Sequence, residues 1–188
     1  MAILPILIAP DPVLEAVSKP VEVVDDEIRI LLRDMAETMY SAPGIGLAAP
    51  QVGVSVRVIV VDVEYGDDPL SRNPLKIVNP EITWLSDEDT SHEEGCLSIP
   101  KHYADVVRPR ALKLKYLDEF GKEQTLEAQD LLAICIQHEI DHLDGILFID
   151  RLDEATRKAA MKEIREAEWF GALPGIQVSP HPINAKWL

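Results

Sequence analysis

The organising segment of this chain is Gln129-Asp-Leu-Leu-Ala-Ile-Cys-Ile-Gln-His-Glu-Ile-Asp-His-Leu-Asp-Gly145. Its run of apolar residues predicts one helix from Gln129 to Leu143, and Gly145 is a typical residue just beyond a helix end. A helix this apolar is expected in the protein interior. We therefore expect the rest of the domain to pack around it.

Two histidines and a glutamate lie within five residues of this helix, as His138-Glu139-Ile-Asp-His142. Residues four apart lie one turn apart on the same helix face, so both imidazoles can reach one ion. Glu139 is rotated from them by about 100° and can reach a metal-bound water instead. Burying these groups without a partner is costly, and a metal ion removes that cost. The spacing indicates a metal-dependent hydrolase in which Glu139 transfers protons.

A catalytic metal site needs a third protein ligand and one open position. One class of zinc protease places a histidine six residues after the second, but here that position is Phe148. Glu163 on a later helix is at a plausible distance. Cys135 lies one turn before His138, with a side chain expected to point away from the ion. Cys96 fits a ligand and a core residue equally well, so the residues alone leave the third ligand open.

The remaining pattern predicts an α+β fold: mainly antiparallel sheets packed around the central HExxH-bearing helix, with an N-terminal and a C-terminal helix. Pro80 suggests an edge strand or a bend in its strand region. The expected elements are a helix from residue 25 to 43, a small-residue loop at 44–53, strands at 56–63 and 76–85, an acidic loop at 87–94, a hairpin starting at 112–117, and a helix at 153–170. We expect one catalytic domain over residues 1–170 and an extended or disordered C-terminal extension over 171–188.

Composition narrows the classes of function. The chain has 188 residues, a formal charge of −15 and two cysteines. The negative charge disfavours direct nucleic-acid readout, because phosphate backbones are repelled. No apolar stretch approaches the roughly 18–20 residues of a membrane span, and two cysteines are few for a secreted scaffold. We expect a cytoplasmic protein without membrane contact.

Three segments together resemble the peptide deformylase family: Gly44-Ile-Gly-Leu-Ala-Ala-Pro-Gln51, Glu94-Gly-Cys-Leu-Ser98 and Gln137-His-Glu-Ile-Asp-His-Leu-Asp-Gly145. The likeness covers roughly residues 1–170 in the family's order. It implies that Cys96, His138 and His142 hold one divalent metal ion, natively Fe(II), with Zn, Ni or Co able to occupy the site. A thiolate and two imidazoles suit such a borderline-soft ion.

The same resemblance implies the reaction, which belongs to protein biosynthesis. Metal-bound water attacks the formyl group of an N-formyl-methionyl peptide, and Glu139 takes the water's proton and returns it to the departing amine. The Gln51 amide and the Leu97 backbone N–H face the substrate carbonyl. The expected substrate-binding residues are Gly44, Ile45, Gly46, Glu94, Gly95, Leu131, Ile134 and Cys135. The substrate is expected to pair like a strand with the glycine loop and with the segment near Glu94.

Two rival functions stay open at this point. One is an HExxH metallopeptidase with Glu163 as the third ligand. The other is a ribosome-associated binding protein with a structural metal, although no fourth protein ligand is apparent. A transient ribosome contact through the C-terminal helix is also open, because that helix carries acidic as well as basic residues. Asp141 can either orient an imidazole or lie in solvent.

Overall fold

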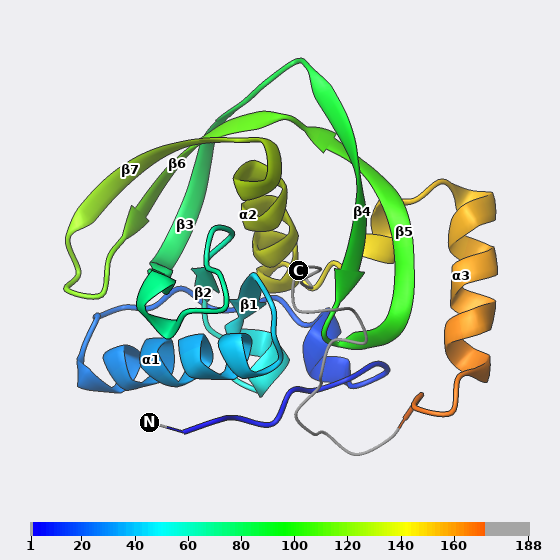
Figure 1. Cartoon of the computed structure of the whole chain (residues 1–188), viewed down its shortest axis with the longest axis horizontal. Helices are drawn as coiled ribbons and strands as arrows, with labels where there is room; N and C mark the ends of the chain where they lie inside the picture. The colour runs from blue at the N-terminus through cyan, green and yellow to red at the C-terminus, as the bar shows by residue number, and fades with distance from the viewer. Residues whose placement is uncertain (1, 172–188) are drawn as a thin grey trace.

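The computed structural model describes residues 2–171 and places a single helix, α2, beneath an arch of strands (Figure 1). The predicted C-terminal extension lies, from residue 172 onward, outside the described residues. The elements are α1 (Asp26–Ser41), β1 (Gly46–Ala48), β2 (Val58–Val61), β3 (Leu75–Leu85), β4 (Asp89–Cys96), β5 (Ile99–Pro109), β6 (Ala111–Leu117), β7 (Glu123–Gln129), α2 (Asp130–Leu143) and α3 (Glu154–Glu166), with short 3-10 turns at Pro12–Glu15, Ala49–Val52, Pro69–Ser71 and Phe148–Arg151. The predicted α+β class and its three helices are confirmed.

Five strands form one antiparallel sheet in the order β1-β2-β3-β6-β7. The sheet bends over α2, while α1 crosses below it (Figure 1). Pro80 does not mark an edge strand, because β3 lies in the middle of the sheet. It lies instead in a register shift between Val78 and Glu81, where a missing N–H is tolerated. The predicted bend is therefore right and the predicted edge wrong.

A separate hairpin of β4 and β5 forms the other side of the arch (Figure 1). The predicted acidic loop at residues 87–94 is wrong, because most of it is strand β4. The first five residues of β4 are exposed apart from the half-buried Thr90, and only Glu94, Gly95 and Cys96 are buried. Charged residues with low strand propensity thus form a strand here because β5 pairs with them along their length. The hairpin ends beside α2 and delivers Cys96 there.

Two apolar cores meet at this point. The larger core joins the five-stranded sheet to α1 and α2 and contains Ile134 and Cys135. The smaller one lies under the hairpin, the turn at Phe148–Arg151 and α3, and contains Cys96 and Phe148. The geometry of a site at such a boundary depends on the packing of both cores. No helix among residues 2–171 is long and apolar enough to cross a bilayer.

The N-terminal segment has little regular structure but bonds to three distant parts of the chain. The backbone N–H of Leu7 donates to Gln51, that of Ala9 donates to Ser98, and that of Ser18 donates to Leu143. Each acceptor lies within a few residues of a predicted site residue. The segment therefore joins the loop after β1, the end of β4 and the end of α2.

The end of α2 depends on Gly145. This residue has φ +74°, a left-handed conformation that glycine adopts without a steric penalty. A Cβ at this position would also collide with the backbone of Glu15. The helix can therefore end and let the N-terminal segment pass closely over it, as the predicted helix boundary requires.

Candidate metal centre

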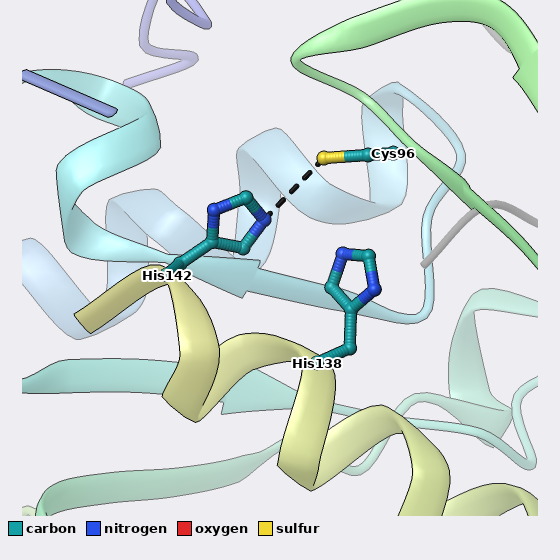
Figure 2. A group of neighbouring side chains, drawn as sticks. All are labelled: Cys96, His138 and His142. Carbon is teal, nitrogen blue, oxygen red and sulfur yellow. Dashed lines mark hydrogen bonds between the residues drawn. The ribbon is translucent and has the colours of Figure 1, made fainter. Parts of the chain in front are cut away.

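Strand β4 and helix α2 bring three ligand-type side chains together. The Sγ of Cys96 and one ring nitrogen each of His138 and His142 all lie within 4.8 Å of one another. Figure 2 shows both imidazoles rising from α2 toward the sulfur, which lies 3.3 Å from the Nε2 of His142. Among residues 2–171 this is the one group of three or more Cys, His, Asp or Glu side chains with such spacing. The arrangement can hold one divalent ion.

The chemistry of these atoms fits a metal ion. Cys96, His138 and His142 are all buried. Within the described part of the chain, the Nε2 of His138 and the Nδ1 of His142 have no hydrogen-bond partner. Buried polar atoms are normally paired, so an unpaired ring nitrogen beside a buried sulfur calls for a ligand. One thiolate and two imidazoles leave a position free on a four-coordinate ion, as a catalytic site requires.

The charges around the histidines also favour a cation. Burial would lower the pKa of His138, but the nearby Cys96 sulfur and the hydrogen bond with Glu94 raise it to about 10. The metal-free ring therefore attracts a second proton, which a metal ion would replace. Burial, together with the nearby charges of His138 and Arg108, holds the pKa of His142 well below its usual range, so its ring stays neutral and able to coordinate.

The two other candidates for the third ligand lie elsewhere. The Cys135 thiol points toward the Ile45 carbonyl and donates a hydrogen bond to it, with an S···O distance of 3.5 Å. Burial and the charge of Glu139 raise the pKa of the Cys135 thiol well above its usual range, so it stays protonated. Glu163 has an exposed side chain on α3 and lies 3.7 Å from His102. The predicted alternative with Glu163 as ligand is therefore wrong.

Glu139 lies beside the cluster and against strand β1. It is fully buried, and neither carboxylate oxygen has a hydrogen-bond partner among the described residues. A Cβ added to Gly46 would lie 2.5 Å from Glu139 Oε1 and 2.8 Å from Cys135 Sγ. Burial raises the pKa of Glu139 to about 7. A carboxyl group that titrates near neutrality is suited to accept and return a proton.

Gln51 faces the cluster from the turn after β1. Its side-chain N–H₂ donates to Cys96 Sγ at 3.6 Å and to Ser98 Oγ at 3.1 Å. Its carbonyl oxygen accepts from the Ala48 N–H at 3.0 Å, which fixes the amide orientation. Leu97 follows Cys96 directly and is fully buried. The backbone N–H of Ala48 therefore directs the Gln51 amide toward the metal ligands.

The predicted substrate loop is held from behind by two hydrogen bonds. The Tyr65 hydroxyl donates to the Gly44 carbonyl at 2.7 Å, and the Asp62 N–H donates to the Ile45 carbonyl at 2.9 Å. Gly46 begins β1, which is an edge strand paired only with β2 within its sheet. Sequence reasoning missed Tyr65, since a tyrosine after a buried strand carries no distinguishing local signal.

The remaining predicted substrate-binding residues lie on α2 and β4. Ile134 and Cys135 are buried beside the cluster, and Leu131 is partly buried at the start of the helix. Gly95 pairs with Tyr103 across the hairpin. Glu94, predicted as a wall of the methionine pocket, directs its carboxylate to His138 Nδ1 at 2.8 Å and to a buried arginine.

Asp141 and the arginines around it form a second layer beneath the ligands. Asp141 is buried, so its predicted solvent-exposed alternative is wrong, and it contacts Arg108 and Arg151 rather than an imidazole. Burial would raise the pKa of Glu94, but hydrogen bonds from His138 and Arg108 lower it to about 2. Sequence reasoning missed Arg108, because nothing local distinguishes it from the exposed Arg110.

Known proteins of one family are similar to this chain. The family model described as Polypeptide deformylase matches residues 3–158. A Peptide deformylase of Phenylobacterium zucineum is 52% identical over 88% of this chain and 97% of its own. One of Acidothermus cellulolyticus is 49% identical over the whole of both chains. The structure of an Ehrlichia chaffeensis peptide deformylase in complex with actinonin superposes with a TM-score of 0.81 at 42% identity, covering 89% of this chain and 99% of the other.

Proposed function

This chain belongs to the polypeptide deformylase family, and on that basis we propose that Cys96, His138 and His142 hold its metal ion. The enzyme is a metal-dependent hydrolase that removes the N-formyl group from the N-terminal formyl-methionine of newly synthesised peptides. The proposal of these three ligands is carried by one observation, the approach of their donor atoms to within 4.8 Å of one another in a buried site.

Fe(II) is the native ion in this proposal, with Zn, Ni or Co able to replace it. The donor set of one sulfur and two imidazole nitrogens supports a borderline-soft divalent cation. When bound, such an ion supplies a Lewis acid that acidifies water and polarises the formyl carbonyl. The buried position of the three ligands favours this role, since charge interactions are stronger away from solvent.

Glu139 is the proposed proton-transfer group. Its carboxylate takes a proton from the attacking water and returns it to the amine that leaves as the formyl C–N bond breaks. The products are formate and a peptide with a free N-terminal methionine. The raised pKa of about 7 supports this role, because the group can both accept and donate a proton near neutral pH.

Gln51 and Leu97 are proposed to stabilise the formyl oxygen as it gains negative charge. The Gln51 N–H₂ already faces Cys96, and its orientation is fixed by the Ala48 N–H. The Leu97 backbone N–H follows the ligand Cys96 in the chain. Donors that are held in place before the reaction lower the barrier without reorganising.

The peptide substrate is proposed to add as a strand beside β1 and the end of β4. In this proposal residues 44–46 and Gly95 contact the peptide backbone, and Leu131, Ile134 and Cys135 contact the methionine side chain. The proximity of Cys135 to Gly46 and Glu139 supports this grouping. Glu94 is kept in this set as the group that holds His138. We propose that residues 1–170 act as one catalytic domain in the cytoplasm, where formylated nascent peptides arise. Transient ribosome contact is part of the same proposal.

The decisive experiment measures formate release from a formyl-Met peptide by anaerobically purified protein. An acetyl-Met peptide is the matched substrate control, because it differs by one methyl group at the acyl carbon. We expect release from the formyl peptide alone, one iron per chain, and inhibition by actinonin, which the Ehrlichia relative binds. Loss of metal from Glu163→Ala but not from Cys96→Ala would overturn the ligand assignment.

A further inference from the structure

A chain of buried ion pairs leads from the protein surface to one of the metal ligands. Arg108, on β5, is 4% exposed. It donates two hydrogen bonds to Glu94, from Nε to Oε2 at 2.7 Å and from Nη2 to Oε1 at 3.0 Å. Its Nη1 donates to Asp141 Oδ2 at 2.9 Å. Asp141 in turn accepts from Arg151 Nε at 3.0 Å and Nη2 at 2.7 Å. Only Arg151, 45% exposed, reaches solvent.

Both carboxylates of this network lie close in sequence to proposed metal ligands. Glu94 lies two residues before Cys96 on β4, and Asp141 lies immediately before His142 on α2. One guanidinium therefore bonds to both the strand that carries the thiol and the helix that carries the imidazoles. The planar fork of arginine fixes both partners in direction, which the single ammonium of lysine cannot do.

Stability alone does not account for these charges. Ion pairs taken out of water contribute little net stability, and apolar residues of similar volume often serve as well. A network of two arginines and two carboxylates does, however, hold its members in one geometry when every donor is satisfied. Glu94 uses its Oε1 both for Arg108 and for His138 Nδ1, so the orientation of the imidazole depends on the arginine.

We propose that Arg108 is a positioning residue that holds Cys96, His138 and His142 at metal-binding distance by bridging Glu94 and Asp141. Through Glu94 it keeps the proton of the neutral His138 ring on Nδ1, so Nε2 carries the lone pair for the metal. Through Asp141 it ties the last turn of α2 to the hairpin. The inference rests on the ligand set proposed above.

The test compares Arg108→Lys with Arg110→Lys. Arg110 lies two residues further along, is 45% exposed, and also bonds two carboxylates, those of Glu88 and Asp130. Both variants are loaded with Co(II), and the readouts are metal affinity by chelator competition and the thiolate-to-cobalt absorption band. We expect Arg108→Lys to bind cobalt about 10–100-fold more weakly and to show an altered thiolate-to-cobalt band. Its kcat should fall while its KM stays unchanged. Arg110→Lys should match the wild type.

Wild-type affinity and an unchanged band in a folded Arg108→Lys protein would overturn the proposal. If that variant does not fold, Asp141→Asn replaces it, since it removes only the α2 half of the bridge. Weaker cobalt binding by Asp141→Asn then supports the proposal, and unchanged binding refutes it. Cys96→Ser separates the two levels of inference. If it keeps the thiolate band, the ligand set and this proposal fail together, whereas cobalt binding through Cys96 without formate release would refute only the function.

Discussion

Helices α2 and α3 have similar lengths and both carry several ionisable residues, yet their environments are opposite. Every residue of α2 from Ala133 to Leu143 is buried, whereas α3 buries only Ala160 and Ile164. Charged groups on α3 are solvated, as in the exposed pair of Lys158 and Glu154. Buried groups on α2 cannot use water, so they require partners or a metal. Burial contributes to the shifted pKa values of Cys135, His138, Glu139 and His142. Burial, more than residue type, separates a chemical site from a solvated helix face.

The sharpest way to test this contrast is Glu139→Gln on α2. The amide has nearly the same size but cannot accept a proton, so we expect formate release to fall by about 10²–10⁴-fold. Metal content should change little, because the three ligands remain. Steady-state kinetics with a formyl-Met peptide, beside metal analysis, measures this effect. A rate within a few-fold of wild type would remove Glu139 from the mechanism.

The second test uses the stability of the metal-free protein. Burial raises the pKa of Glu139 from an ordinary value of 4.5 to about 7. Because the folded-state pKa is the higher one, its stabilising contribution is complete below about pH 4.5 and is lost as pH rises through 7. We expect wild type to lose up to about 3 kcal/mol across this window relative to Glu139→Gln. Urea unfolding at several pH values measures the difference, and parallel profiles would contradict it.

Gly46→Ala examines how tightly α2 is packed against its neighbour. The new Cβ would lie 2.5 Å from Glu139 Oε1 and 2.8 Å from Cys135 Sγ, so the strand or the helix must shift. We expect a loss of about 1–3 kcal/mol in the free energy of unfolding. Gly66→Ala is the matched control, since its nearest atom would be Ser71 Oγ at 3.9 Å. Equal stabilities for the two variants would show that β1 and α2 are loosely packed.

The smallest effect is expected on α3. Glu163→Gln changes an exposed side chain that lies 3.7 Å from the Nδ1 of His102. We expect the free energy of unfolding to stay within about 0.5 kcal/mol of wild type, with metal content and formate release unchanged. The same assays used for Glu139→Gln measure it. Loss of metal from this variant would restore the peptidase alternative.

The parts of the fold that depend on local pattern could be predicted from the sequence. Helix α2 shows this best, because its apolar run and the spacing of His138 and His142 are properties of adjacent turns. Strand β4 could not be predicted, since its exposed charged residues form a strand only through pairing with β5. Periodicity reveals a strand only when alternate residues are buried, and the consecutive residues Ser91, His92 and Glu93 of β4 are all exposed.

The residues of the candidate site could likewise be predicted only in part. The residues alone left Cys96 no better than a core cysteine, because its approach to α2 joins positions more than forty residues apart. Only the resemblance singled it out. The ion pairs of Arg108 were not predicted at all, since a buried arginine and an exposed one look identical in a strand of alternating polarity. Contacts between segments that are distant in the sequence could not be predicted from the residues alone.

The N-terminal segment has a consequence for how the protein is made. Leu7, Ala9 and Ser18 bond to residues synthesised much later, the last of them Leu143. These residues therefore leave the ribosome before their native partners do, and the hydrogen bond of Ser18 cannot form until Leu143 has been made. An enzyme that trims other nascent chains thus cannot complete its own fold before the end of α2 has been synthesised.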